Sequence, residues 1–76
     1  MSEVKILRPF DMLNNSINKQ VLVLLKDDLQ IRGKLKAFDV HMNIVLEDAE
    51  ELKDNKTKAK YTDIILRGDN IVWVTV

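Results

Sequence analysis

Strict alternation of apolar and polar side chains is the clearest pattern in this chain, and it falls between residues 29 and 37. The odd positions carry Leu29, Ile31, Gly33, Leu35 and Ala37, whereas the even positions carry only polar or charged residues. This period of two is typical of a β-strand with one face in the core and the other in solvent. Gly33 falls on the core side, where a missing side chain permits a bulge or a sharp bend. The segment therefore predicts a bent strand with Ala37 on its core face.

Four further runs of apolar and β-branched residues predict strands, at residues 20–25, 44–50, 61–66 and 71–76. Charged or glycine-containing segments separate these runs. The longest of them, residues 53–58, is expected to be a solvated turn, and Gly68 in a later turn is available for a positive φ.

The segment before the first of these strands, residues 8–14, predicts a short helix. Pro9 suits a first helical turn, where a missing N–H costs little. Phe10, Leu13 and Ile17 recur at spacings of three and four, which gives the helix one apolar face to lay on a sheet. A helix followed by five antiparallel strands, one of them sharply bent, predicts a small open barrel of the mostly β class.

The last two strands are apolar on both faces, as the runs Ile64-Ile65-Leu66 and Ile71-Val72-Trp73-Val74 show. A small barrel buries only one face of each strand, and a long apolar strand left at an open edge invites uncontrolled pairing. Pairing with an identical neighbour removes that hazard, and complementary edges joined head to tail generate a closed ring. The sequence therefore predicts a homo-oligomeric ring.

The composition limits both the sources of stability and the kind of function. A chain of 76 residues makes one small domain, residues 1–76. It has no cysteine and a single histidine, so we expect no disulfide, no metal site and no cofactor. The formal net charge is zero, whereas proteins that grip nucleic acid mainly through phosphates are usually basic. Any binding of nucleic acid would therefore depend on bases held in a local pocket.

No segment is long and apolar enough to span a membrane. The first residues, Met1 to Lys5, lack the charged and apolar pattern of a signal peptide. A cytoplasmic location is therefore expected. That expectation sets aside the interpretation of Arg67-Gly68-Asp69 as a cell-adhesion tripeptide, which would require an extracellular protein.

Two loops, residues 39–43 and 67–70, gather the polar side chains that could carry chemistry. His41 and Arg67 present flat groups, and a base of single-stranded RNA could stack between them. Asn43 offers one donor and one acceptor that match O4 and N3–H of uracil, a pattern that cytosine reverses. The sheet topology could bring both loops to the same end, which favours a base-binding pocket.

The carboxylates of Asp39 and Asp69 could hold the arginine or asparagine side chain in place. Asp39 and His41 could also orient one another as part of a catalytic triad, but the chain lacks a cysteine and its serines lie in or beside the N-terminal segment. We therefore expect no enzymatic activity. Each site residue also has an ordinary interpretation: a surface histidine, a local turn at Asn43, and an exposed ion pair between Arg67 and Asp69.

The chain carries two motifs in order. The first consists of Leu25-Lys26-Asp27, Ile31-Arg32-Gly33-Lys34-Leu35 and Phe38-Asp39-Val40-His41-Met42-Asn43-Ile44-Val45-Leu46; the second is Ile65-Leu66-Arg67-Gly68-Asp69-Asn70-Ile71; Arg8-Pro9-Phe10-Asp11 precedes both. These motifs resemble those of the Sm and Sm-like (LSm) RNA-binding proteins, and the chain is most similar to their archaeal members; Arg8-Pro9-Phe10-Asp11 is similar to the family's helix start. The resemblance spans nearly the whole chain from Arg8 onward.

The resemblance implies a bent, SH3-like five-stranded barrel capped by a helix, and a ring that usually has seven subunits. In such a ring, the fourth strand of one subunit pairs with the fifth strand of its neighbour. U-rich single-stranded RNA is expected at the inner rim. Carried over to this chain, the RNA-binding residues are His41 and Arg67 for stacking, Asn43 for the uracil edge, Asp39 and Asp69 as supports, and Gly68 for the shape of its loop.

The implied role is that of an RNA scaffold or chaperone in RNA processing, with other RNA-processing proteins as candidate partners. One alternative is a small barrel that mediates only protein–protein assembly, with both loops as ordinary turns. The ring size of six, seven or eight subunits stays open, as does a second RNA surface near Arg8 and Phe38 on the helix face.

Overall fold

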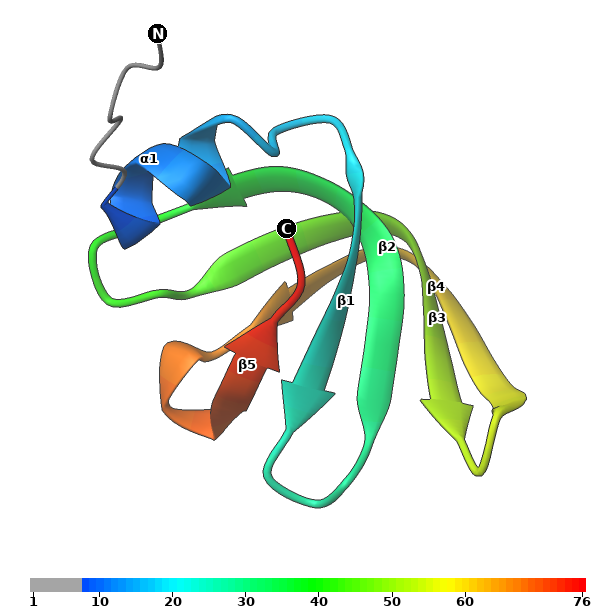
Figure 1. The fold of residues 1–76 in the computed structure, drawn as a ribbon. Coiled ribbons are helices and arrows are strands. Elements are labelled where there is room, and N and C mark those ends of the chain that lie inside the picture. Colours follow the sequence, from blue (N-terminus) through cyan, green and yellow to red (C-terminus); the bar gives the residue numbers. More distant parts are fainter. Residues whose placement is uncertain (1–7) are drawn as a thin grey trace, which may run out of the picture.

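The computed structural model describes residues 8–76, so the segment from Met1 to Lys5 lies outside the described residues. One short helix precedes five strands that form a single antiparallel sheet in the order β4-β3-β2-β1-β5 (Figure 1). This confirms the predicted mostly β class with a short N-terminal helix. The elements are α1 (Pro9–Asn14), β1 (Gln20–Leu25), β2 (Gln30–Phe38), β3 (Ile44–Lys53), β4 (Lys56–Leu66), a 3-10 turn η1 (Gly68–Asn70) and β5 (Ile71–Val74).

The sheet bends where Gly33 lies on β2. The register of β2 against β3 shifts at this position, and Asp48 on the facing strand takes a positive φ of 53°. A Cβ atom on Gly33 would lie 3.1 Å from the Cα of Ala49 and 3.2 Å from its Cβ, which is closer than ordinary contact. The missing side chain thus lets β3 pass close to β2, and the predicted bulge at Gly33 is confirmed.

A second bulge changes which side of β2 faces the core. The pairing of β2 with β3 shifts again between Leu35 and Ala37. A slip of one residue exchanges the two faces of a strand. The prediction of Ala37 as a core residue is therefore wrong, because Ala37 is exposed. Phe38 turns inward instead, half-buried, and packs edge-on against Phe10 with ring centroids 5.2 Å apart.

Residues 53–58 are all exposed, as predicted, but they are mostly strand, so their prediction as a turn throughout is wrong. Only Asp54 and Asn55 lie outside β3 and β4. Both have positive φ, 53° and 64°, as in the two-residue hairpin turns whose twist matches that of the flanking strands. Lysine is depleted in strands, which hid this extension from a sequence pattern. At the end of an exposed hairpin, however, charged side chains point into water.

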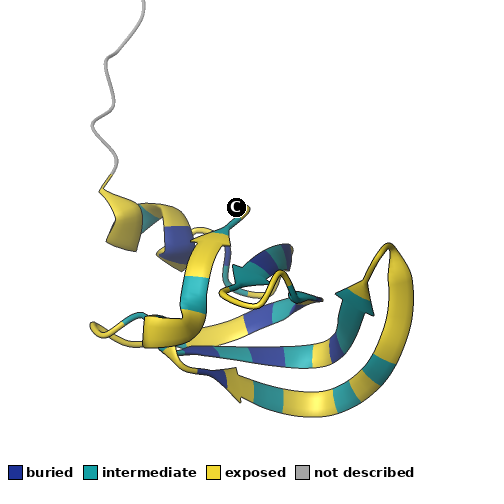
Figure 2. Cartoon of the chain, turned by 90° about the horizontal axis from the view of Figure 1, so that it is seen from below, coloured by how far each residue is buried: buried dark blue, intermediate teal, exposed yellow. Residues whose placement is uncertain are grey.

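The core lies inside the bend of the sheet. Figure 2 shows buried residues alternating with exposed ones along the strands. Leu13 is the one core residue of α1, which covers one end of the sheet. None of the helices in the described chain is long and apolar enough to cross a membrane. The buried apolar residues are Leu13, Val21, Val23, Ile31, Leu35, Ile44, Leu46, Ala49 and Leu66.

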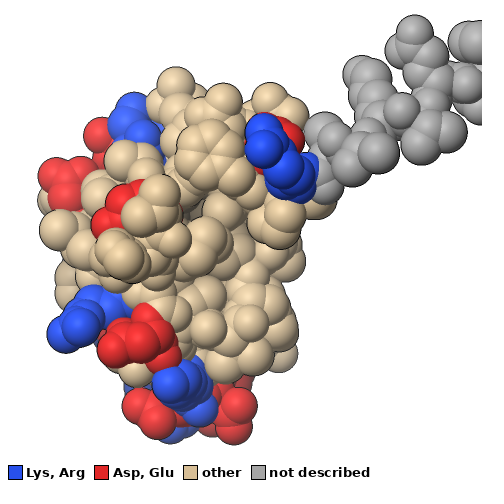
Figure 3. Space-filling view, turned by 90° about the vertical axis from the view of Figure 1, so that its left-hand side faces the viewer, with Lys and Arg blue, Asp and Glu red and all other residues tan. Residues whose placement is uncertain are grey.

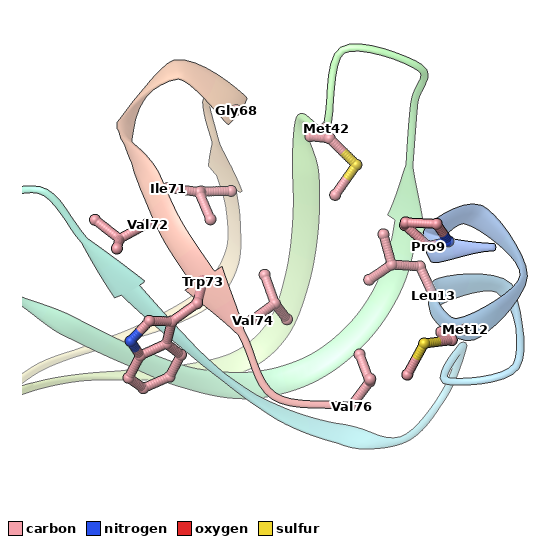
Figure 4. Close-up of a pocket in the computed structure, with 10 residues that line it drawn as sticks. All are labelled: Pro9, Met12, Leu13, Met42, Gly68, Ile71, Val72, Trp73, Val74 and Val76. Atoms are coloured by element: carbon pink, nitrogen blue, oxygen red, sulfur yellow. The ribbon is translucent and has the colours of Figure 1, made fainter. Parts of the chain in front are cut away.

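The two edge strands, β4 and β5, expose large apolar side chains. Ile65 is 69% exposed, Val72 56% and Trp73 41%. An apolar groove of about 390 Å³ runs between α1 and β5, lined by Leu13 and Val74 among others (Figure 4). The side of the molecule seen in Figure 3 is largely uncharged, with its charged side chains toward the margins. The predicted apolar outer faces of the last two strands are therefore present and uncovered.

Truncation of a fully buried side chain tests the placement of the core. Leu46 has no exposed surface. We expect Leu46→Ala to lower the free energy of unfolding by about 2–5 kcal/mol, because it removes buried methyl groups and leaves a cavity. Urea unfolding measures the change. Val40→Ala is the control, since Val40 is 81% exposed and its truncation should change stability little; equal effects of both variants would contradict this core.

Candidate functional site

Asp39 closes the loop between β2 and β3. Its Oδ1 accepts hydrogen bonds from the backbone N–H of His41, at 2.9 Å, and of Asn43, at 3.1 Å. Its Oδ2 accepts a third from Nδ2 of Asn43 at 3.0 Å. Short polar side chains favour such local turns because they bond to the backbone just beyond them. Met42, with a positive φ of 64°, completes the reversal.

These hydrogen bonds favour the ionised form of Asp39. The side-chain amide of Asn43 is the largest cause, and it holds the pKa of Asp39 below its ordinary value of 3.8. The backbone N–H groups of Asn43 and His41 and the nearby imidazole act in the same direction, while partial desolvation opposes them. Asp39 therefore stays charged and keeps the loop closed at neutral pH.

Asn43 links this loop to the next one. Its Oδ1 accepts a hydrogen bond from the backbone N–H of Gly68 at 2.9 Å. An N–H can only donate and the ionised carboxylate of Asp39 can only accept, so the amide is held in one orientation. The bond to Asp39 uses one of the two N–H groups of the amide, and the bond from Gly68 uses one of the two lone pairs of its oxygen. One N–H and one lone pair therefore remain for a ligand.

Gly68 is required by a close approach of the two loops. A Cβ atom at this position would overlap the carbonyl oxygen of His41 and would lie 2.9 Å from the carbonyl carbon of Met42. The expectation of a positive φ at Gly68 is wrong, since no glycine among the described residues has one. Space, and not backbone conformation, is what only glycine provides here.

The remaining site residues lie around this junction. Nη2 of Arg67 is 3.7 Å from Oδ2 of Asp69, and both side chains are mostly exposed. Asp39, Asn43 and Arg67 border a common hollow of about 540 Å³. His41 is exposed on the first loop and does not line that hollow; it contacts the second loop through its backbone carbonyl.

The floor of the hollow is apolar, which sequence reasoning missed. Val45 and Ile65 line it and face one another across β3 and β4. Ala37, turned outward by the second bulge, lines it as well. Val45 and Ile65, the apolar residues on the outer face of β3 and β4 beside the two loops, could have indicated this floor in the sequence. The polar rim and the apolar floor together make a site for a flat, partly apolar ligand with polar edges.

The described part of the chain offers few groups for catalysis or metal binding. Ser16 is buried, and its hydroxyl donates a hydrogen bond to the carbonyl of Met12 at 3.0 Å. No cluster of three His, Cys, Asp or Glu side chains suited to a metal ion occurs within residues 8–76. Asp39, the carboxylate nearest to His41 in the loop, is already occupied by its three hydrogen bonds.

Substitution of Gly68 tests the contact between the loops. We expect Gly68→Ala to lower the free energy of unfolding by about 1–3 kcal/mol, because the added methyl group forces the loops apart. Thermal or urea unfolding measures this loss. Asp69→Ala is the matched change in the same turn, and it should have little effect since it removes only an exposed ion pair. A Gly68→Ala protein as stable as wild type would contradict the described contact.

The pH dependence of stability tests the hydrogen bonds of Asp39. A carboxyl group whose pKa is lower in the folded state stabilises the fold above its unfolded pKa, and this contribution is lost as the pH falls through the folded pKa. Wild type should therefore lose stability on acidification below the ordinary value of 3.8. Asp39→Asn should be less stable than wild type at neutral pH, and the difference should shrink in acid. Urea midpoints across this range measure it, and a difference that does not change with pH would refute the assignment.

Comparisons with known proteins agree with this arrangement. Residues 11–76 match the family model described as LSM domain. A putative snRNP Sm-like protein of Methanosarcina acetivorans is 47% identical over 68 residues, which cover 90% of this chain and 94% of that protein.

Comparison with solved structures indicates the same family. The Sm protein of Pyrococcus abyssi, determined in complex with a uridine heptamer, has a TM-score of 0.89 and 40% identity, covering 91% of this chain and 97% of that one. A heptameric archaeal Sm protein has a TM-score of 0.79 and 45% identity, covering 84% and 93%. The two motifs, the bent five-stranded sheet and these relatives together show that the chain belongs to the LSM domain family and is similar to its archaeal Sm-like members.

Proposed function

We propose that copies of this chain assemble into a ring that binds U-rich single-stranded RNA at its inner rim. The observation that carries the proposal is the amide of Asn43, held in one orientation by Asp39 and Gly68 with one donor and one acceptor left over. A relative with 40% identity and the same fold was determined with a uridine heptamer bound. The proposed site is thus suited to the ligand that this relative carries.

The edges of the sheet support self-association. In β4 and β5, Ile65 and Trp73 lie exposed, and within residues 8–76 each of these strands has an edge that no other strand pairs with. Pairing of β4 in one copy with β5 in the next would satisfy both edges and cover these side chains. A relative with 45% identity is a heptamer. A ring of seven copies would place the two loops of each copy around a common opening.

Uracil fits the free positions of the Asn43 amide. The remaining N–H of Asn43 can donate to O4, and the remaining lone pair can accept from N3–H. Cytosine presents a donor and an acceptor in the reverse positions, so it meets two mismatches. The planes of His41 and Arg67 would hold the ring by stacking. Asp39 would support Asn43, and Asp69 would support Arg67 through the ion pair between them.

Repetition explains how a chain without net charge could bind RNA well. Each copy would offer one weak base site, and linked sites raise the overall affinity without new contacts.

The whole chain would act as one Sm-like domain, without enzymatic activity and in the cytoplasm, as a scaffold or chaperone for RNA. A second RNA surface near Arg8 and Phe38 stays a prediction. Both residues already have partners within the chain: Arg8 pairs with Asp11, and Phe38 contacts Phe10.

Native mass spectrometry with short RNAs tests ring and ligand together. We expect a heptamer that binds oligouridine at least roughly tenfold more tightly than oligocytidine, because several uracil-specific hydrogen bonds act in one ring. Asn43→Ala and His41→Ala should weaken binding of oligouridine, and the first should also reduce the preference over oligocytidine. Asn14→Ala, an exposed asparagine at the end of α1, is the control and should bind like wild type.

Three outcomes would contradict the proposal. A monomer under all conditions would remove the common opening on which the proposal depends. A ring that binds both oligomers equally weakly would favour the alternative function, a barrel that mediates only protein–protein assembly. RNA that is shortened during long incubation with the purified protein would contradict the expected lack of catalysis.

A further inference from the structure

The tip of the β3–β4 hairpin carries lysines that form no ion pair with a carboxylate among residues 8–76. Lys53, Lys56 and Lys58 are exposed, and residues 53–58 contain these three lysines against one acidic residue, Asp54. The four ion pairs found in this part of the chain all involve basic residues elsewhere. We call these three lysines the lysine tip. It is a local concentration of positive charge on a chain whose formal net charge is zero.

Strand pairing brings two of these three charges close together. Lys53 lies directly opposite Lys56 in the antiparallel pair. Like charges in directly opposite positions destabilise a sheet. Lys58 occupies the extra position on β4 where the register against β3 shifts, between Thr57 and Ala59. An anionic partner would relieve the repulsion that this arrangement creates.

The acidic side chains further along the hairpin have partners of their own. Glu50 accepts hydrogen bonds from Oγ1 of Thr57 at 3.0 Å and from Nη2 of Arg32 at 3.5 Å. Glu51 accepts one from the hydroxyl of Tyr61 at 2.8 Å. Thr57 lies between Lys56 and Lys58, yet neither carboxylate forms an ion pair with the lysine tip, so its three charges can attract an external anion.

The lysine tip is presented on a regular scaffold. Asp54 and Asn55 form a two-residue hairpin turn with positive φ at both positions, and the strands are paired up to Lys53 and Lys56. Figure 2 shows the tip of this hairpin fully exposed. A partner would therefore meet three ammonium groups whose backbone is already ordered, which lowers the entropic cost of binding.

The lysine tip is remote from the base site. It lies at the other end of β4 from Arg67, and Figure 1 shows the β3–β4 turn and the segment that follows β4 at opposite ends of the hairpin. At about 3.3 Å per residue, the 11 residues of β4 would span roughly 36 Å if straight. A uridine held at Asn43 could not touch these lysines, but RNA that continues beyond the ring could.

We propose that the lysine tip binds the sugar–phosphate backbone of RNA that flanks the uridine tract. The inference rests on the proposed function, since the base site must first hold the RNA on the ring. Cyclic symmetry would repeat the lysine tip once per copy at the same height on one side of the ring. The flanking RNA would meet this set of lysines without any requirement for sequence, because its phosphates make the interaction.

The test compares a short and a long RNA on the assembled protein. The short RNA is heptauridine, and the long RNA carries the same heptauridine tract between cytidine flanks. Wild type should bind the long RNA several-fold more tightly at low salt, with a steeper dependence on salt. In the triple variant Lys53→Gln, Lys56→Gln, Lys58→Gln, this gain should disappear, and the slope of log affinity against log salt should fall by roughly 0.7 for each phosphate that the variant no longer neutralises. Binding of heptauridine should not change.

Controls separate charge from other effects of the substitutions. The triple variant with arginine at the same three positions keeps the charge and should retain the gain for the long RNA. Lys19→Gln removes an exposed lysine outside the hairpin and should bind both RNAs like wild type. The glutamine variant should form a ring with the same number of subunits as wild type. Its unfolding midpoint should match or exceed that of wild type, since the substitutions remove like-charge repulsion.

The possible failures are distinguishable. Equal affinity of wild type and the glutamine variant for the long RNA would overturn the role of the lysine tip while leaving the base site intact. Aggregation of the glutamine variant together with unchanged RNA binding would show that the lysines only protect an edge strand. Failure of wild type to bind heptauridine would refute the proposed function itself.

Discussion

A sheet of five strands can enclose a core only if it bends, and the bend at Gly33 is the constraint on which the rest of this structure depends. The missing side chain lets β3 pass within 3.1 Å of where a Cβ would be, and the adjoining bulges turn the strands around a small apolar interior. The bend buries one face of β1, β2 and β3. It also leaves β4 and β5 as separate edges, each with apolar side chains on its outer face.

The candidate site is a consequence of strand pairing. Because β3 and β4 run antiparallel, with Ile44 opposite Leu66, the loop after β2 and the turn after β4 meet at one end of the hairpin, where the carbonyl of His41 leaves no room for a side chain on Gly68. The hydrogen bonds from Asp39 through Asn43 to Gly68 then hold two segments 25 residues apart in one arrangement. A rigid amide with unused hydrogen-bonding positions is what a base-specific site requires, so packing and recognition depend on the same contacts.

The formal net charge of zero conceals an uneven distribution of charged side chains over the molecule. The loops at the site hold an arginine and two carboxylates in close hydrogen bonds and one ion pair, whereas the far end of the hairpin concentrates lysines that no carboxylate of residues 8–76 pairs with. Recognition of bases and attraction of phosphates would therefore occupy different ends of one hairpin. An RNA-binding protein with no net charge is consistent with this separation, because base recognition needs directed hydrogen bonds more than a basic surface.

The sequence by itself determined the order of strands along the chain, the bend at Gly33 and the identity of the polar loops, because alternation and local turn residues report short-range structure directly. It also indicated that the last two strands would keep an apolar outer face. Only the tertiary structure decided that Ala37 turns outward, that residues 53–58 are mostly paired strand, and that Gly68 is needed for space. Each of these depends on how one segment is aligned with its neighbour, and a shift of one residue in that alignment leaves no trace in the composition of either strand.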